Sequence, residues 1–163
     1  VMKNIAKHGP IFECNPDSID ILSTPDEFYS NLIEYSKHAK NRILLSSLYV
    51  GQGNKERNLI DTIKGNIDDN NELNVDILMD YSRGLRNIDQ GKCALNTIEP
   101  IMGNDRVNVG LFKSPNYTGI WKWIGQRSRE LCGVHHMKAY IFDDTLVISG
   151  ANLNETYLTN RQD

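Results

Sequence analysis

The sequence predicts an α/β sandwich built on a mixed or largely parallel β-sheet. Segments with the composition of strands alternate with segments whose apolar residues recur at helical spacing. The last two strand-like segments are separated only by the acidic turn Asp143-Asp144, so they should form an antiparallel hairpin. The chain of 163 residues can bury one hydrophobic core, and no internal repeat or low-complexity segment is visible. We therefore expect a single domain over residues 1–163.

Residues that disrupt regular structure, and a signal for a helix N-terminus, predict the first elements of the chain. Residues 1–17 lack a regular pattern and should be an irregular lead-in. A short strand is plausible at residues 19–22, "IDIL". The stretch "TPDE" then places Thr24 before a proline and two acidic residues, which is typical of a helix N-terminus. This helix should end near residue 40.

The middle of the chain repeats a strand, helix, strand pattern. Residues 42–50, "RILLSSLYV", read as a strand that ends at the two glycines of "GQG". Apolar spacing predicts a helix over residues 55–66, and the turn "DDNN" separates it from a strand at 73–80. A third helix is expected over residues 92–102, interrupted near Pro100.

The last third contains three more predicted strands. Residues 106–112 alternate apolar and polar side chains as a strand does. Residues 114–133 lose this pattern and should be a loop or short helix. The closing hairpin is expected to use residues 134–142 and 146–149.

Composition and charge argue against several classes of protein. A net charge of -3 disfavours a broad electrostatic surface for nucleic acid. No run of about 18 apolar residues is present, so no membrane-spanning helix is expected. Cys14, Cys93 and Cys132 are widely spaced, which favours a reducing compartment over a disulfide framework or a zinc site. No targeting segment is recognised, and the start at Val1 and polar end suggest a fragment.

The segment "VHHMKAYIFDDTLVISGAN" carries the strongest chemical signal. In an extended strand, His136 and Lys138 point to the same side, whereas His135 points to the other. Asp143 follows at the turn, and Asn152 comes after Gly150 and an alanine that let a ligand approach the backbone closely. We therefore expect His136 and Lys138 to share one pocket.

Such a pocket suits a phosphodiester. Lys138 can donate charge-assisted hydrogen bonds to phosphate oxygens, Asn152 can act as a neutral donor, and His136 can be a nucleophile or proton carrier. Asp143 is expected to orient an imidazole or a lysine, because a phosphate would repel a carboxylate. The alternative is that His136 and Lys138 merely lie on an edge strand and Asp143 belongs to a turn.

His136, Lys138, Asp143 and the following "SGAN" resemble the HKD motif of the phospholipase D superfamily. The usual motif continues as Gly-Ser-x-Asn, whereas here the Asn arrives one residue early and alanine replaces the serine. The stretches "SSLYVGQG", "DYSRGLRN" and "SGANLNETYLTNRQD" further resemble the N-terminal half of mitochondrial phosphatidylglycerophosphate synthases. This resemblance implies an α/β/α sandwich with a mixed sheet, one half of a pseudo-twofold enzyme with two motifs.

The resemblance also implies an activity and its partners. The phosphatidyl group of CDP-diacylglycerol would pass to glycerol 3-phosphate through a phosphohistidine, releasing CMP. A second HKD half, from the same natural chain or a dimer partner, would complete the site, and peripheral contact with membrane lipid is expected. Neither a cofactor nor nucleic acid is expected, and no carboxylate cluster at Mg²⁺-binding spacing accompanies the motif. The implied location is the matrix side of the mitochondrial inner membrane.

Three further groups are candidates with competing interpretations. Arg83 and Arg86 follow a strand end and could bind a substrate phosphate or simply be solvated. Tyr49 could line the nucleotide pocket or only end a strand. Trp121 and Trp123, interleaved with basic residues, could contact a membrane or pack over the core.

Two other functions remain open from sequence alone. One is an HKD phosphodiesterase, a nuclease or phospholipase that uses water as acceptor and works as a homodimer of single-motif chains. The other is a non-catalytic domain that binds lipid or phosphate without turnover.

Overall fold

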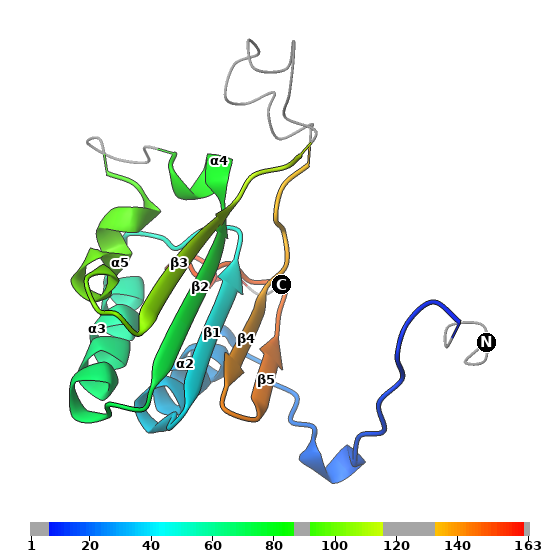
Figure 1. The fold of residues 1–163 in the computed structure, drawn as a ribbon. Helices are drawn as coiled ribbons and strands as arrows, with labels where there is room; N and C mark the ends of the chain where they lie inside the picture. The colour runs from blue at the N-terminus through cyan, green and yellow to red at the C-terminus, as the bar shows by residue number, and fades with distance from the viewer. Residues whose placement is uncertain (1–6, 87–91, 116–132, 162–163) are drawn as a thin grey trace.

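The computed structural model describes residues 7–86, 92–115 and 133–161, and it contains one five-stranded sheet in the order β3-β2-β1-β4-β5 (Figure 1). Strands β1 (Arg42–Ser47), β2 (Asn74–Asp80) and β3 (Val107–Phe112) are parallel. Strand β4 (Ala139–Phe142) runs antiparallel to β1, and β5 (Thr145–Ile148) runs antiparallel to β4. The predicted mixed sheet and the closing hairpin are both confirmed.

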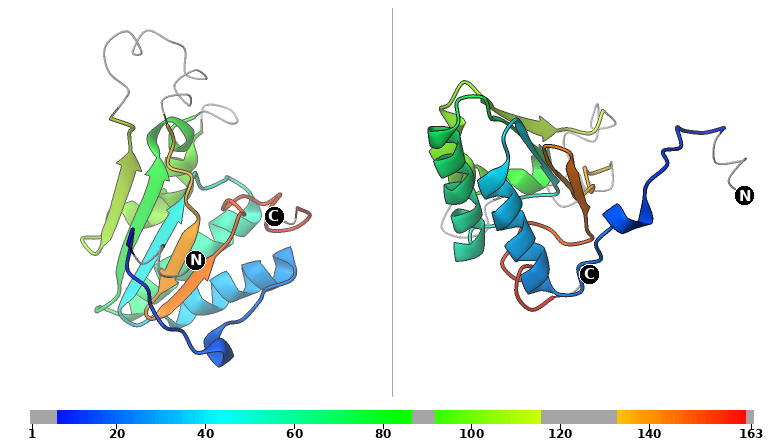
Figure 2. Two further views of the ribbon diagram at one scale, coloured as in Figure 1. Left: turned by 90° about the vertical axis from the view of Figure 1, so that its right-hand side faces the viewer. Right: turned by 90° about the horizontal axis from the view of Figure 1, so that it is seen from below.

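Three helices pack side by side against one face of this sheet. Helix α2 (Pro25–His38) contacts α3 (Asn54–Asp69), and α3 contacts α5 (Ala94–Met102). Figure 2 shows α2 and α3 together on one side of the sheet. The 3-10 turn η1 (Pro16–Ser18) and the short α4 (Tyr81–Gly84) complete the helical elements of the described residues. The crossovers from β1 through α3 and from β2 through α5 create the parallel part of the sheet.

Side-chain alternation places the hydrophobic core under these helices. Ile43 and Leu45 on β1 are fully buried, and so are their neighbours in register on β2 and β4. On the other face, Leu146 and Ile148 of β5 are 56% and 74% exposed. The second helical layer of an α/β/α sandwich is not among the residues that the structure describes.

Helix α2 begins as the sequence predicts. Thr24 Oγ1 accepts a hydrogen bond from the backbone N–H of Glu27 at 3.1 Å, and Glu27 Oε2 accepts one from the N–H of Thr24 at 3.3 Å. This reciprocal pair is a capping box, which satisfies two backbone donors at the helix N-terminus. The predicted end near residue 40 is two residues beyond the observed end at His38.

Two local predictions are wrong. Residues 19–22 form no strand; Ile19 and Ile21 are 58% and 85% exposed, because no neighbouring strand pairs with them. Helix α5 is not interrupted near Pro100 but continues to Met102. Pro100 lies in the last turn, so its missing N–H removes one bond at the end of the helix rather than in its middle.

The predicted strand over residues 134–142 is too long at its start. Strand β4 begins only at Ala139, which pairs with Ser46, and β1 ends one residue later at Ser47, so residues 134–137 have no β1 residue opposite them. The predicted loop at 114–133 falls mostly on residues 116–132, which lie outside the described ranges. In the part of the chain that the structure describes, no helix is long and apolar enough to cross a membrane.

The exposed glycine of α3 provides a test of the helix assignment. A methyl group on Gly65 would meet no atom within 4 Å. Gly65→Ala should therefore raise the free energy of unfolding by about 1 kcal/mol, because alanine restricts the unfolded chain and favours the helix. Urea unfolding followed by circular dichroism measures this, and lower stability would contradict a helix at this position.

Candidate active site

Four chain segments converge at one end of the sheet. The parallel strands β1 and β2 end there, at Ser47 and Asp80, while residues 133–138 lead into β4 and residues 149–155 leave β5 (Figure 1). Ligands of open α/β sheets bind where the C-terminal ends of the parallel strands leave a crevice. All the predicted site residues except Asp143 lie in or next to these segments within the described part of the chain.

The structure brings His136 and Lys138 together. Lys138 Nζ lies 3.0 Å from each nitrogen of the His136 ring and also donates to the His136 carbonyl oxygen at 3.0 Å. Lys138 is only 6% exposed, whereas His136 is exposed. A buried ammonium group thus stands directly beside an imidazole that an incoming ligand can reach. A cation in this position would attract an anionic phosphate to the histidine.

Hydrogen bonds with Tyr140 and Ser149 fix the backbone just before Asn152. Tyr140, fully buried on β4, donates its hydroxyl to the carbonyl of Ala151 at 3.1 Å, and Ser149 Oγ accepts the N–H of Ala151 at 3.0 Å. Asn152 itself is 6% exposed, and its Oδ1 has no hydrogen-bond partner among the described residues. Gly150 is exposed between Ser149 and Ala151, as a residue approached by a ligand would be.

His135 belongs to the site region, although alternation had placed it away from the pocket. Its Nε2 forms a 2.7 Å hydrogen bond with Ser46 Oγ at the end of β1, and its backbone N–H donates to Asp80 Oδ2 at 3.0 Å. Burial lowers the pKa of His135, the Asp80 carboxylate raises it, and the Lys138 ammonium lowers it, so that the pKa falls below 6.5. His135 therefore ties the segment before β4 to the ends of β1 and β2. The HKD pattern contains no signal for this role.

Tyr49 and Arg83 lie close to each other on neighbouring strand ends. Burial raises the pKa of the Tyr49 hydroxyl, and Tyr157 adds to this effect, while the positive charges of Arg83 and Arg161 oppose it. Arg161 also stacks over the Tyr157 ring, 4.9 Å from its centroid. Sequence reasoning named neither Tyr157 nor Arg161, although both lie in the quoted "SGANLNETYLTNRQD". Together these groups form one region with two tyrosines and two arginines.

The structure describes the candidate Arg86 but not the two candidate tryptophans. Arg86 is half-buried just after α4, and its N–H donates to the Arg83 carbonyl at 3.3 Å, which places the two arginines on one turn. Trp121 and Trp123, the candidates for membrane contact, lie outside the described residues.

Asp143 lies at the opposite end of the sheet from His136. It occupies the β4–β5 turn with φ of 52°, and its carboxylate accepts the backbone N–H groups of Lys40, Asn41 and Arg42 at 2.7, 2.7 and 3.0 Å. Asp143 comes seven positions after His136, and a fully extended chain of that length spans about 23 Å. The structure therefore does not bring Asp143 together with the imidazole or lysine of its own motif. Its contacts instead fasten the β4–β5 turn to the start of β1.

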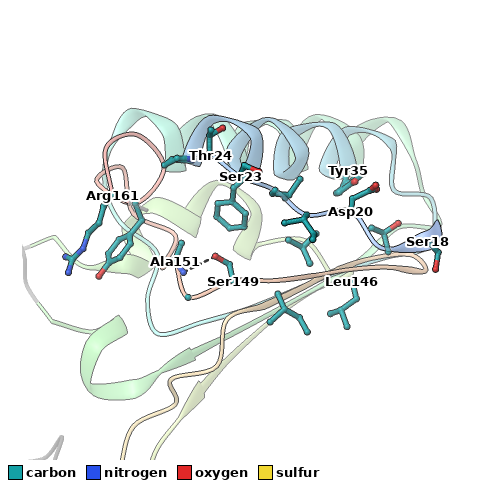
Figure 3. A pocket seen from close by; sticks show the side chains of 18 residues that line it. Ser18, Asp20, Ser23, Thr24, Tyr35, Leu146, Ser149, Ala151 and Arg161 are labelled. Carbon is teal, nitrogen blue, oxygen red and sulfur yellow. Dashed lines mark hydrogen bonds between the residues drawn. The ribbon is translucent and has the colours of Figure 1, made fainter. Parts of the chain in front are cut away.

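A groove of about 560 Å³ runs beside the site, between residues 18–25 with α2 on one side and β5 on the other (Figure 3). Arg161 and Ala151 lie toward one end and Ser18 toward the other. His136, Lys138 and Asn152 do not line it, but Ser149, Gly150, Ala151, Tyr157 and Arg161 do. No group of three or more His, Cys, Asp and Glu side chains suited to a metal occurs within the described ranges.

Comparison with known proteins gives a consistent set of relatives. The chain is 41% identical to a probable CDP-diacylglycerol–glycerol-3-phosphate 3-phosphatidyltransferase of Dictyostelium discoideum, over 98% of this chain and 28% of that protein. It is 37% identical to the mitochondrial enzyme of that name from Gallus gallus, over 94% of this chain and 29% of the relative. A Schizosaccharomyces pombe relative of the same name is 40% identical, over 94% and 31%. The chain thus spans about three tenths of these relatives. No family model matches it.

Two solved structures share the fold. Phosphatidylserine synthase of Haemophilus influenzae matches with a TM-score of 0.70 and 27% identity, over 88% of this chain and 30% of that one. NucT from Helicobacter pylori matches with a TM-score of 0.58 and 16% identity, over 84% and 74%.

Both of these structural neighbours are members of the phospholipase D superfamily. The chain is homologous to one segment of the CDP-diacylglycerol–glycerol-3-phosphate 3-phosphatidyltransferases.

The carboxylate of Asp143 should contribute to stability in a pH-dependent way. Burial raises the pKa of Asp143, but the backbone donors of Lys40, Arg42 and Asn41 outweigh this and leave the pKa below 3.8. The contribution is therefore present above pH 3.8 and disappears as the pH falls through the lower folded value. Asp143→Asn, which also tolerates positive φ, should cost about 2 kcal/mol at pH 7 in urea unfolding, and this cost should shrink as the pH falls below 3.8.

The neighbouring turn residue provides the control for this experiment. Asp144 has a fully exposed side chain whose contact with Arg42 is 3.9 Å long. Asp144→Asn should therefore change stability by less than about 0.5 kcal/mol. Equal losses in both variants would show that the Asp143 bonds to the start of β1 do not stabilise the chain.

The charges around His135 should be visible in its titration. Removing the Lys138 charge in Lys138→Met should raise the pKa of His135, and removing the Asp80 charge in Asp80→Asn should lower it. The exposed Lys37→Met serves as a control and should leave it unchanged. Titration of the ring protons by NMR measures all three. Since the unfolded chain binds this proton more readily, the free energy of unfolding should also fall as the pH drops through 6.5.

Proposed function

We propose that this chain supplies one HKD motif of a phosphatidyltransferase that converts CDP-diacylglycerol and glycerol 3-phosphate into phosphatidylglycerophosphate and CMP. The observation that carries the proposal is the His136–Lys138 pair, an accessible imidazole 3.0 Å from a buried ammonium group. The segment that forms it is 37 to 41% identical to enzymes with this name in the fowl and slime-mould relatives. The reaction would serve phosphatidylglycerol and cardiolipin biosynthesis.

The proposed chemistry is a double displacement on phosphorus. One motif histidine attacks the phosphatidyl phosphorus; a P–N bond forms while the bond to CMP breaks, and the histidine of the other motif gives its proton to the leaving CMP. A hydroxyl of glycerol 3-phosphate then attacks the phosphohistidine, loses its proton to that second histidine and takes the phosphatidyl group. The covalent intermediate splits one difficult transfer into two in-line steps. His136 would act either as the nucleophile or as the acid and base.

The surrounding residues have matching roles in this proposal. Lys138 and the amide of Asn152 would stabilise negative charge on the non-bridging phosphate oxygens. Arg83 and Arg86 would bind a second phosphate, that of glycerol 3-phosphate or of the nucleotide, and Tyr49 and Gly150 would line the substrate pocket. Asp143 would support the motif from a distance by fixing the hairpin that carries it.

The proposal includes a cellular location for the chain and a source for the second motif. Several of the relatives are named mitochondrial, which supports a mitochondrial location, and we place the reaction on the matrix side of the inner membrane. Residues 1–163 would form one domain with the first of two HKD motifs. The second motif would come from the same natural polypeptide or from a dimer partner. A lipid substrate would require peripheral contact with the membrane, for which Trp121 and Trp123 are the candidates.

A second candidate function is a phosphodiesterase that transfers the group to water. One observation favours it: the chain covers 74% of NucT, so a chain of similar length can contain this whole fold. A homodimer would then bring two copies of His136 together. The net charge of -3 argues against nucleic acid as its substrate.

The deciding experiment follows lipid product and CMP from CDP-diacylglycerol in liposomes that contain EDTA. The longest natural version of the chain is used, with and without glycerol 3-phosphate. Phosphatidylglycerophosphate should form only with the acceptor, and His136→Ala should reduce its rate at least about a thousandfold. His38→Ala, which changes an exposed histidine on α2, is the matched control and should retain full activity.

The other outcomes identify the competing functions. Release of CMP and phosphatidic acid, regardless of glycerol 3-phosphate, would identify the phosphodiesterase. Saturable lipid binding without turnover would identify a non-catalytic binding domain, and transfer that survives His136→Ala would remove the histidine from the chemistry.

A further inference from the structure

We propose that Glu56 is a positioning residue, whose buried carboxyl fastens the loop that carries Asn152 to the N-terminus of α3. The role of Asn152 in this inference rests on the proposed function. Glu56 is the third residue of α3 and is 0% exposed. Such complete burial is rare for a glutamate unless specific partners hold it.

One oxygen of this carboxyl has a defined long-range partner. Glu56 Oε1 accepts the backbone N–H of Glu155 at 2.6 Å, across 99 residues of sequence. Glu155 lies three residues after Asn152, so the bond acts on the same loop. A hydrogen bond from a backbone donor to a buried carboxyl is costly to remove, because the donor is then left without a partner.

The two glycines of "GQG" leave the space that this carboxyl occupies. A Cβ on Gly51 would overlap Glu56 Oε1 and would lie 2.8 Å from Asn154 Nδ2. A Cβ on Gly53 would overlap the Glu155 carboxylate and would lie 2.6 Å from Glu56 Oε2. Neither glycine has positive φ, so the requirement is for space rather than for an unusual backbone conformation.

Backbone contacts complete the clamp between the two loops. Gly51 donates its N–H to the Leu153 carbonyl at 2.7 Å, and its own carbonyl accepts the Thr97 hydroxyl at 2.7 Å. Val50 and Leu153 form a parallel bridge. The bonds to Leu153 and Glu155 thus hold the chain just after Asn152, while Tyr49 lies just before the anchoring loop. Glu56 therefore sets the separation between the Tyr49 and Asn152 sides of the candidate site.

The surroundings of the second oxygen, Oε2, indicate that an uncharged side chain at position 56 can also hold the Glu155 loop. Glu56 Oε2 has no hydrogen-bond partner among the described residues, and the neighbouring Glu155 carboxylate is also close to Gly53. Burial raises the pKa of Glu56 and the charge of Glu155 raises it further, against the effect of nearby backbone N–H groups. A protonated carboxyl can accept from the Glu155 N–H through one oxygen and donate toward the Glu155 carboxylate through the other. The amide of glutamine offers the same acceptor and donor.

The test compares Glu56→Gln and Glu56→Ala in the longest natural version of the chain, with Glu99→Ala on the exposed side of α5 as the matched control. Glu56→Gln should keep kcat/KM for phosphatidyl transfer within about threefold, while Glu56→Ala should lower it about 10- to 100-fold. In an Asn152→Ala background the further effect of Glu56→Ala should shrink to less than about threefold, because both changes affect one interaction. Equal effects in both backgrounds would overturn the proposal.

Amide hydrogen exchange provides a readout that needs no activity. The Glu155 N–H should be protected in the wild type and in Glu56→Gln, and should exchange at least about tenfold faster in Glu56→Ala. Exchange in the core of β1 should remain unchanged. If the wild type transfers no phosphatidyl group, the proposed function fails, while this measurement still decides the role of Glu56. Unchanged exchange at Glu155 in Glu56→Ala would refute the clamp.

Discussion

The antiparallel pairing of β4 with β1 is the interaction upon which the site depends. Only four residue pairs form it, from Ile43 with Phe142 to Ser46 with Ala139. Asp143 fixes one end of this short ladder through three backbone bonds, and His135 fixes the other through Ser46. Because side chains alternate between faces, a slip of one residue would move Lys138 to the opposite side of the sheet. The register therefore decides on which side of the sheet the His136–Lys138 pair stands.

Much of the fold could be predicted because local signals and tertiary structure agree. The capping sequence before α2 and the spacing of apolar residues in α3 are local properties, and they survive in the structure. The strand expected at residues 19–22 failed because a strand needs a partner, which no local pattern supplies. The predicted interruption at Pro100 was wrong because the effect of a proline on a helix depends on how close it lies to the helix end.

The site was predicted less completely than the fold, for a related reason. Alternation correctly placed His136 and Lys138 together, because both lie a few residues apart in one extended segment. The contacts of Asp143, His135 and Glu56 join residues 55 to 103 positions apart in the sequence. Such contacts follow from topology and not from spacing. The glycines before α3 were visible in the sequence, but their meaning required the carboxyl that fills the space beside them.

The free edge of β5 has a consequence for handling the chain in solution. This strand pairs only with β4 in the described residues, and its sequence Thr145–Ile148 contains neither a charge nor a proline. Leu146 and Ile148 also expose most of their surface on the face away from the helices. Proteins commonly protect such edges with lysine, proline or a bulge, since an unprotected edge recruits strands from other molecules. Concentrated solutions of the isolated chain should therefore form oligomers by edge-to-edge association, and a lysine at position 146 should suppress them.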